Sequence, residues 1–152
     1  MPRVDWKLPM EGACRCGKVR IRVTAPPLLT SACHCTGCQR MTASAYSLTM
    51  AVPGSGFEVI EGETVIGGLH GPVAHHHFCD HCKTWMYTTA EGMPFVNVRP
   101  TMLDDCRAFV PFIEVYAAEG FEWAKTPAKH RFDGAPAYEA YEGLIAEFMA
   151  QG

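Results

Sequence analysis

The sequence predicts a single, mainly β domain that ends in one helix. Its 152 residues, of which 48% are hydrophobic and 19% charged, are enough for one ordinary domain with a core of its own. Short runs rich in β-branched and aromatic residues alternate with Gly and Pro, which is typical of small folded sheets. The chain has no internal repeat, low-complexity tract or charge block. We therefore expect residues 1–152 to form one domain.

The clearest strand pattern lies near the N-terminus. In residues 17–24 apolar and polar side chains alternate with β-branched residues on one face, and Pro26 and Pro27 end the run. Turns that contain Gly or Pro separate the later runs. Those strand-like runs cover residues 44–52, 57–60, 73–78, 84–88, 95–98 and 109–115.

Only the C-terminal segment has a clear helical period. Apolar side chains recur at helical spacing from Tyr138 to Met149, and glutamates lie off that stripe. We expect this helix, at about residues 137–150, to pack on the sheet or, alternatively, to be exchanged across a homodimer. Residues 101–106 are also compatible with a short helical turn.

The charge balance excludes some classes of partner. Thirteen Lys and Arg against sixteen Asp and Glu give a net charge of -3, so the chain has no basic surface for nucleic acid. No run approaches the ~20 apolar residues that a membrane-spanning helix needs, and residues 1–10 lack the apolar core of a signal peptide. We expect a cytoplasmic protein without a nucleic-acid or membrane partner.

Eight cysteines are the most informative feature of the chain. In a reducing compartment such thiols are metal ligands or reactive groups more often than disulfides. Cys106 stands alone and is most simply a small buried hydrophobic residue. The other seven form three clusters: Cys14 and Cys16; Cys33, Cys35 and Cys38; Cys79 and Cys82.

The first and third clusters together predict a structural zinc site. Cys14 and Cys16 are two residues apart at the head of a strand, so both side chains point the same way. Cys79 and Cys82 have the spacing of a zinc knuckle. Four thiolates complete a tetrahedral site that links the first strand to the middle of the sheet. The alternative is two buried thiol pairs without metal.

The middle cluster predicts a second zinc site with an open position. Cys33, Cys35 and Cys38 lie in one six-residue loop, and three protein ligands leave the fourth tetrahedral position for water or substrate. Three thiolates on Zn²⁺ leave net charge -1, which suits holding an incoming thiol as thiolate for reversible addition to a small electrophilic carbon. The alternative is a shell closed by a fourth side chain, with His34, His75, His76, His77 and Cys106 as candidates.

Residues near these clusters have less specific interpretations. His34 is expected to orient a metal ligand through a hydrogen bond rather than to act as a base. Arg40 either pairs with a substrate carboxylate or lies on the surface. The histidines at 75–77 alternate along a strand, so all three cannot meet at one ion without a bend. Four aromatic residues are expected in the core or lining a pocket: Trp85, Tyr87, Phe95 and Trp123.

Three cysteine motifs follow one another in a specific order. Residues 12–20 read Gly-Ala-Cys-Arg-Cys-Gly-Lys-Val-Arg, residues 33–40 read Cys-His-Cys-Thr-Gly-Cys-Gln-Arg, and residues 78–82 read Phe-Cys-Asp-His-Cys. This ordered set resembles the glutathione-dependent formaldehyde-activating enzyme family, which includes centromere protein V. The likeness covers roughly residues 10–136, with Trp123, Phe132 and Pro136 near its end.

The resemblance implies a folded antiparallel β scaffold like that of the Rab-exchange-factor zinc proteins, with two zinc ions per chain. It implies a structural ion at the first and last motifs and a catalytic ion at the middle one. The ligands would be Cys14, Cys16, Cys79 and Cys82 for the structural ion, and Cys33, Cys35 and Cys38 for the catalytic ion. Family members usually have Gly after the last cysteine pair, where this chain has Lys83, so we expect a differently shaped knuckle there.

The resemblance also implies the activity, which joins formaldehyde to glutathione as S-(hydroxymethyl)glutathione and is a carbon-sulfur lyase reaction in reverse. The expected partners are a glutathione-type thiol and a small aldehyde. Two alternatives stay open. One is a zinc-stapled binding module in which both zinc ions are structural, and the other is an enzyme of the same scaffold that acts on another thiol or aldehyde.

Overall fold

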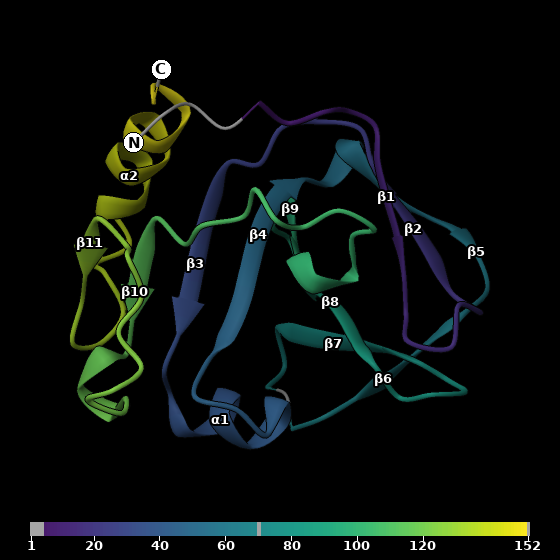
Figure 1. Cartoon of the computed structure of the whole chain (residues 1–152), viewed down its shortest axis with the longest axis horizontal. Coiled ribbons are helices and arrows are strands. Elements are labelled where there is room, and N and C mark those ends of the chain that lie inside the picture. The colour runs from purple at the N-terminus through teal and green to yellow at the C-terminus, as the bar shows by residue number, and fades with distance from the viewer. Residues whose placement is uncertain (1–4, 70, 152) are drawn as a thin grey trace.

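Two sheets form the framework of the protein in a computed structural model that describes residues 5–69 and 71–151. The smaller sheet is antiparallel, with strand order β1-β2-β5. Its strands are β1 (Met10–Ala13), β2 (Arg20–Val23) and β5 (Phe57–Glu61). Figure 1 shows this sheet at the upper right, beside the larger one.

The larger sheet has strand order β11-β10-β3-β4-β9-β8-β7-β6. It is antiparallel except that β10 pairs in parallel with β3 and β11. Its strands are β3 (Leu29–Cys33), β4 (Ser47–Pro53), β6 (Thr64–Gly67), β7 (Ala74–Cys79), β8 (Trp85–Ala90), β9 (Phe95–Val98), β10 (Ile113–Val115) and β11 (His130–Arg131). The topology brings segments that are far apart in sequence, such as β3 and β10, to neighbouring positions.

Two helices lie at different places around the large sheet (Figure 1). Helix α1 (Thr36–Thr42) connects β3 to β4, and helix α2 (Ala140–Met149) packs against β3 near the C-terminus. Three 3-10 turns complete the described elements: η1 (Gly54–Gly56), η2 (Pro100–Met102) and η3 (Ala117–Glu119). Within the described residues, no helix combines the length and the apolar character needed to cross a bilayer.

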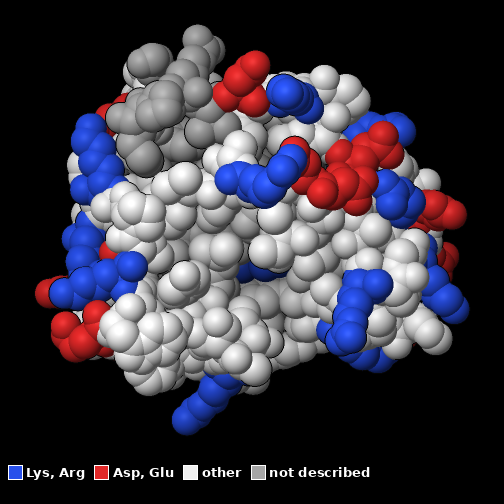
Figure 2. Space-filling view, in the orientation of Figure 1, with Lys and Arg blue, Asp and Glu red and all other residues white. Residues whose placement is uncertain are grey.

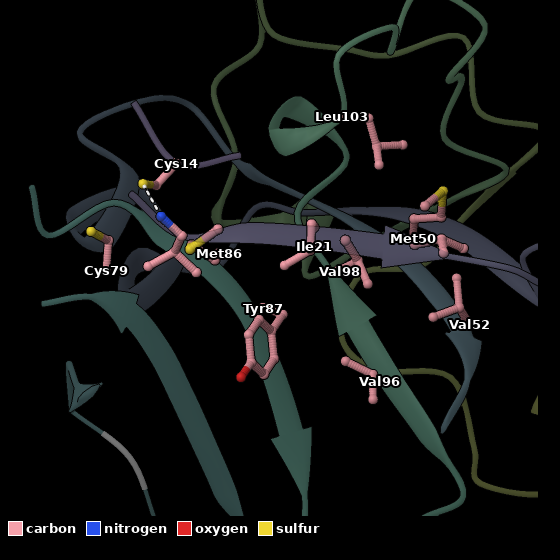
Figure 3. Packing of buried hydrophobic residues seen from close by; sticks show 12 residues of the cluster. Cys14, Ile21, Met50, Val52, Cys79, Met86, Tyr87, Val96, Val98 and Leu103 are labelled. Atoms are coloured by element: carbon pink, nitrogen blue, oxygen red, sulfur yellow. Dashed lines mark hydrogen bonds between the residues drawn. The ribbon is translucent and has the colours of Figure 1, made fainter. Parts of the chain in front are cut away.

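The main core lies between the small sheet and one face of the large sheet. Ile21 of β2, Val52 of β4 and Val98 of β9 are fully buried there, because the alternation in each strand places its apolar residues on the facing side. Figure 3 shows this packing, with Cys14 and Cys79 at one end of the cluster. A second cluster of Leu29, Phe112, Ile113 and Leu144 holds α2 against the sheet.

The predicted fold class, mainly β with a C-terminal helix, is confirmed. Several predicted strand boundaries differ from the structure. The strand expected at 17–24 begins only at Arg20, and the strand expected at 109–115 is reduced to Ile113–Val115. In place of the helical turn expected at 101–106, the structure has the 3-10 turn η2, which begins one residue earlier and ends at Met102. The sequence interpretation missed β1, β3, β6, β11 and α1.

Candidate metal centres

Four of the predicted ligands meet at one place, where two turns approach each other. Cys14 and Cys16 lie in the turn between β1 and β2, and Cys79 and Cys82 lie at the end of β7 and in the turn before β8. Their sulfurs all lie within 4.8 Å of one another, with 3.5 Å between Cys14 and Cys16 and 3.7 Å between Cys16 and Cys79. A tetrahedral zinc with bonds of about 2.3 Å needs sulfurs about 3.8 Å apart. The donor set and its spacing therefore fit zinc.

Local backbone geometry, rather than strand alternation, aims these sulfurs at one point. The expectation that Cys14 and Cys16 lie on a strand is wrong, because β2 starts only after the turn. In each half of the group the residue after the second cysteine has positive φ: 80° at Gly17 and 58° at Lys83. Lys83 thus adopts the left-handed conformation that a glycine would take at that position, at a cost of about 1–2 kcal/mol.

Backbone N–H groups point at the same sulfurs. Val19 N–H donates to Cys14 Sγ at 3.4 Å, and Cys82 N–H donates to Cys79 Sγ at 3.4 Å. The Thr84 hydroxyl lies 3.1 Å from Cys82 Sγ. Its hydrogen bond is the largest of the influences that lower the pKa of that thiol to about 5. Such donors stabilise negative charge on sulfur, as a metal-binding thiolate requires.

The three cysteines of the middle motif also come together. Cys33 is the last residue of β3, Cys35 is the N-cap of α1, and Cys38 lies in its first turn. Their sulfurs all lie within 4.8 Å of one another. Cys38 N–H donates to Cys35 Sγ at 3.3 Å, which repeats the contact between the second and first cysteine of the knuckle at 79–82. This group could hold a metal ion as well.

In the part of the chain that the structure describes, no fourth His, Cys, Asp or Glu joins this group within the same 4.8 Å. His34 contacts Glu114 through its Nε2, and Cys106 packs against the main core. His76 contacts the Thr88 hydroxyl, and His77 contacts those of Thr64 and Thr89. The candidate fourth ligands from the sequence therefore point elsewhere or remain outside the group.

The charges within the three-cysteine group differ between its members. A hydrogen bond with Cys33 lowers the pKa of Cys38 to about 6, against the effect of burial. The same bond with Cys38, together with burial, raises the pKa of Cys33. Burial raises the pKa of Cys35. Without a metal, the hydrogen bond between Cys33 and Cys38 therefore favours negative charge on Cys38.

A buried hydrogen bond between His34 and Glu114 supports the cysteine loop. His34 is 1% exposed and Glu114 is 2% exposed, with Nε2 and Oε1 2.8 Å apart. Glu114 also accepts from Thr126 N–H at 2.9 Å and from the Arg131 guanidinium at 2.8 Å. Burial opposes ionisation of Glu114, but these donors outweigh it and the pKa of Glu114 is lowered. The ionised carboxylate accepts only, so His34 Nε2 carries the proton between them.

Turn η3 and the residue after it hold the other side of the loop. The Glu119 carboxylate accepts from Thr36 N–H at 3.1 Å. The Gln39 amide donates to the backbone oxygens of His34 at 2.8 Å and Glu119 at 3.0 Å. Gly120 lies so close that a Cβ there would be 2.8 Å from His34 Nδ1. The loop is therefore fixed by residues more than 80 positions away.

The remaining sequence-predicted residues have mixed outcomes. Tyr87 is buried in the core, and Trp85 and Phe95 are half-buried, but Trp123 is 77% exposed and stacks on Phe121 at the surface. The placement of Trp123 in the core is therefore wrong. Arg40 is exposed. Sequence reasoning did not identify Glu114, whose only signal is a charged residue inside an apolar run.

The fold and the two sulfur groups define a mainly β protein with two cysteine clusters that could bind metal ions, consistent with zinc. The family model for the glutathione-dependent formaldehyde-activating enzyme matches residues 9–119. The chain belongs to this family, and the matched span contains all the clustered cysteines.

A solved structure shares the fold. The crystal structure of a Rhodobacter sphaeroides protein matches with a TM-score of 0.52 and 23% sequence identity, over 62% of this chain and 88% of that one. No curated protein matches the chain.

Proposed function

We propose that this protein is a zinc-dependent carbon-sulfur lyase-type enzyme that activates a glutathione-type thiol for reversible addition to formaldehyde or a related small aldehyde. The observation that carries the proposal is the group of three sulfurs, on Cys33, Cys35 and Cys38, which no fourth described ligand completes. Membership of the family supports the choice of glutathione and formaldehyde. Both sulfur groups need reduced thiols, which fits a cytoplasmic protein.

The two groups would have different roles. Cys14, Cys16, Cys79 and Cys82 would hold a closed structural zinc, because four sulfurs fill a tetrahedral shell. A zinc ion at the three-cysteine group would supply positive charge that keeps an incoming thiol ionised at neutral pH. The addition then forms one carbon-sulfur bond while the carbonyl electron pair moves to oxygen, which takes a proton from water. The reverse reaction breaks the same bond.

The chain's own contribution is to keep three sulfurs at a fixed spacing on one side of the reacting thiol. The β3 end places Cys33, and the first turn of α1 places Cys35 and Cys38. The His34–Glu114 pair behind the loop and the Glu119 contacts beside it hold that turn in place. Preorganised ligands of this kind avoid a reorganisation cost when metal and substrate bind. His34 is buried against Glu114, which supports a positioning role.

The test combines metal stoichiometry with a count of sulfur ligands. Zinc content is measured with and without glutathione, and X-ray absorption counts sulfurs, in the wild-type protein, Cys35→Ser and the matched Cys16→Ser. We expect two zincs per chain and a glutathione-dependent gain of one sulfur, lost in Cys35→Ser and retained in Cys16→Ser. NMR measures the exchange of ¹³C-formaldehyde with S-(hydroxymethyl)glutathione. The variants that gain the sulfur ligand should accelerate this exchange, and Cys35→Ser should not.

One result would overturn the proposal. If both zinc shells contain four protein ligands and do not respond to glutathione, the three-cysteine group cannot receive a substrate thiol. The protein would then be a zinc-stapled binding module with two structural ions.

A further inference from the structure

A buried arginine near the three-cysteine group has no acidic partner among the described residues. Arg99 follows β9 directly, and its side chain is 7% exposed. The guanidinium carbon lies 4.2 Å from the centroid of the Trp85 ring. Arg99 Nε has no hydrogen-bond partner among the described residues, and none of their carboxylates forms an ion pair with it. A buried guanidinium without an anion is costly, so its position calls for a nearby negative charge.

The strand register places Arg99 across β4 from Cys33. Cys33 pairs with Ser47 across β3 and β4, and Met50 pairs with Val98 across β4 and β9. Arg99 therefore lies next to the same stretch of β4 that flanks Cys33. Ser47, whose hydroxyl is likewise buried without a hydrogen-bond partner of standard geometry among the described residues, stands between them. Figure 2, in the orientation of Figure 1, shows a hollow near the centre of the molecule with Lys or Arg atoms inside it.

The negative groups that act on Arg99 are thiols of the candidate site. Burial lowers the pKa of Arg99 to about 10, and the charges of Cys38 and Cys33 act in the opposite direction. The guanidinium therefore remains cationic at neutral pH. In contrast, Arg131 on the other side of the loop is neutralised by Glu114 at 2.8 Å. Of these two arginines, Arg99 alone has sulfur as its counter-charge.

We propose that Arg99 is the built-in counter-charge of the three-cysteine centre and sets its affinity for metal and for an anionic fourth ligand. Three thiolates and one divalent ion carry net charge -1, and a substrate thiolate as fourth ligand makes this -2. A fixed guanidinium reduces the total to -1 among partly buried sulfurs, where uncompensated charge is more expensive than in water. Arg99 is a positioning residue here, since it acts through the cysteines. The part about substrate rests on the proposed function, whereas the part about metal does not.

Stacking on Trp85 fixes this charge without the need for a carboxylate. A cation over the face of Trp is stabilised by the ring, and the Arg99 guanidinium carbon lies 4.2 Å from the centroid of the Trp85 ring. A carboxylate in the same place would neutralise the arginine and cancel its effect on the thiolates. The pairing with an aromatic ring therefore preserves the positive field at the site.

The test uses Co²⁺ as a spectroscopic probe in wild-type protein, Arg99→Met, Arg99→Lys and the exposed control Arg107→Met. Co²⁺ affinity at each sulfur group is measured at pH 7.5 by competition with a chelator, and Cys35→Ser assigns the signal of the three-cysteine group. We expect Arg99→Met to weaken Co²⁺ binding there by about 10- to 100-fold. Binding at the four-cysteine group should not change. Arg99→Lys, which keeps the charge, should retain most of the affinity, and Arg107→Met should match wild type.

Two results would overturn the proposal. One is equal Co²⁺ affinity of Arg99→Met and wild type at the three-cysteine group. The other is a parallel loss in Arg99→Met and Arg99→Lys at both groups with a fall in melting temperature, which would show that Arg99 only packs.

Glutathione added to the Co²⁺ protein separates this inference from the proposed function. If the wild-type ligand-field spectrum does not respond, the proposed function fails while the metal affinities still decide the role of Arg99. If it responds, Arg99→Met should also bind glutathione about ten-fold or more weakly.

Discussion

Replacement of Glu114 by Gln tests whether the buried pair behind the loop holds this part of the fold. Glu114 is 2% exposed and accepts from three donors at 2.8 to 2.9 Å. Hydrogen bonds to a charged group contribute about 1.5–3 kcal/mol each. Gln keeps one acceptor oxygen, turns an NH₂ toward a donor and leaves the Arg131 cation without an anion. We therefore expect Glu114→Gln to lower the free energy of unfolding by about 3–5 kcal/mol.

Urea unfolding at pH 7 with excess zinc, followed by tryptophan fluorescence, measures this difference. The matched control is Glu58→Gln, which removes an exposed ion pair with Arg22 at 3.1 Å and should cost at most about 1 kcal/mol. A cost for Glu114→Gln no larger than that of the control would refute the reasoning.

The pH dependence of the same difference has a defined sign. The pKa of Glu114 is lowered in the folded protein, so its stabilisation is fully present above the ordinary carboxyl pKa of about 4.3. That stabilisation is lost as pH falls through the lowered value. The difference between wild type and Glu114→Gln should stay constant from pH 8 to pH 6 and shrink only in acid. A change of that difference near pH 7 would contradict the assignment.

Four further substitutions give distinct outcomes in urea or thermal unfolding. Gly120→Ala should cost about 1–3 kcal/mol because its Cβ would lie 2.8 Å from His34 Nδ1, whereas Gly143→Ala, in open space on α2, should stabilise by about 0.5–1 kcal/mol. Lys83→Gly should stabilise by up to about 1 kcal/mol because it relieves the positive φ; no gain would contradict that strain. Cys82→Ser should abolish most of the fall in melting temperature that a zinc chelator causes in wild type.

The strands that the sequence predicts best are those with one face in the main core. In β2, Ile21 and Val23 are buried and alternate with arginines, and β9 begins and ends at the predicted residues. Strand β3 lacks this pattern because Thr30 is fully buried. Its hydroxyl donates to Val110 O at 2.7 Å and accepts from Phe112 N–H at 3.0 Å. A polar residue satisfied by a partner 80 positions away has no local signal.

Helix α1 was missed for a different reason. None of its residues is buried, so it has no apolar period to detect. Its start depends on Cys35, whose sulfur accepts from Cys38 N–H, and cysteine is not a usual N-cap. Its end depends on Ala43 at φ 52°. The spacing of the cysteine motif therefore indicated a ligand loop but not the helix that shapes it.

Cysteine spacing was sufficient to divide the seven clustered thiols into the two groups that the structure brings together. The residues around them could not be found in the same way. Glu114 contacts the loop through His34, and Arg99 follows β9 beside β4. Both positions depend on the β10–β3 and β4–β9 registers of the assembled sheet. Short sequence motifs predict the metal ligands themselves. The positions of the residues that orient or neutralise those ligands depend on long-range strand pairing, which short motifs do not indicate.

The sequence separations within the two groups lead to different energetic roles. In the four-cysteine group Cys16 and Cys79 are 63 positions apart, and by the chain-entropy relation used for disulfides such a link restricts the unfolded chain by roughly 4 kcal/mol. A link across the six-residue motif of Cys33 to Cys38 restricts it by only roughly 2 kcal/mol. A metal in the first group therefore contributes more to holding the sheets together. The second group, already fixed by Glu114 and Glu119, would lose less stability if one coordination position had no protein ligand.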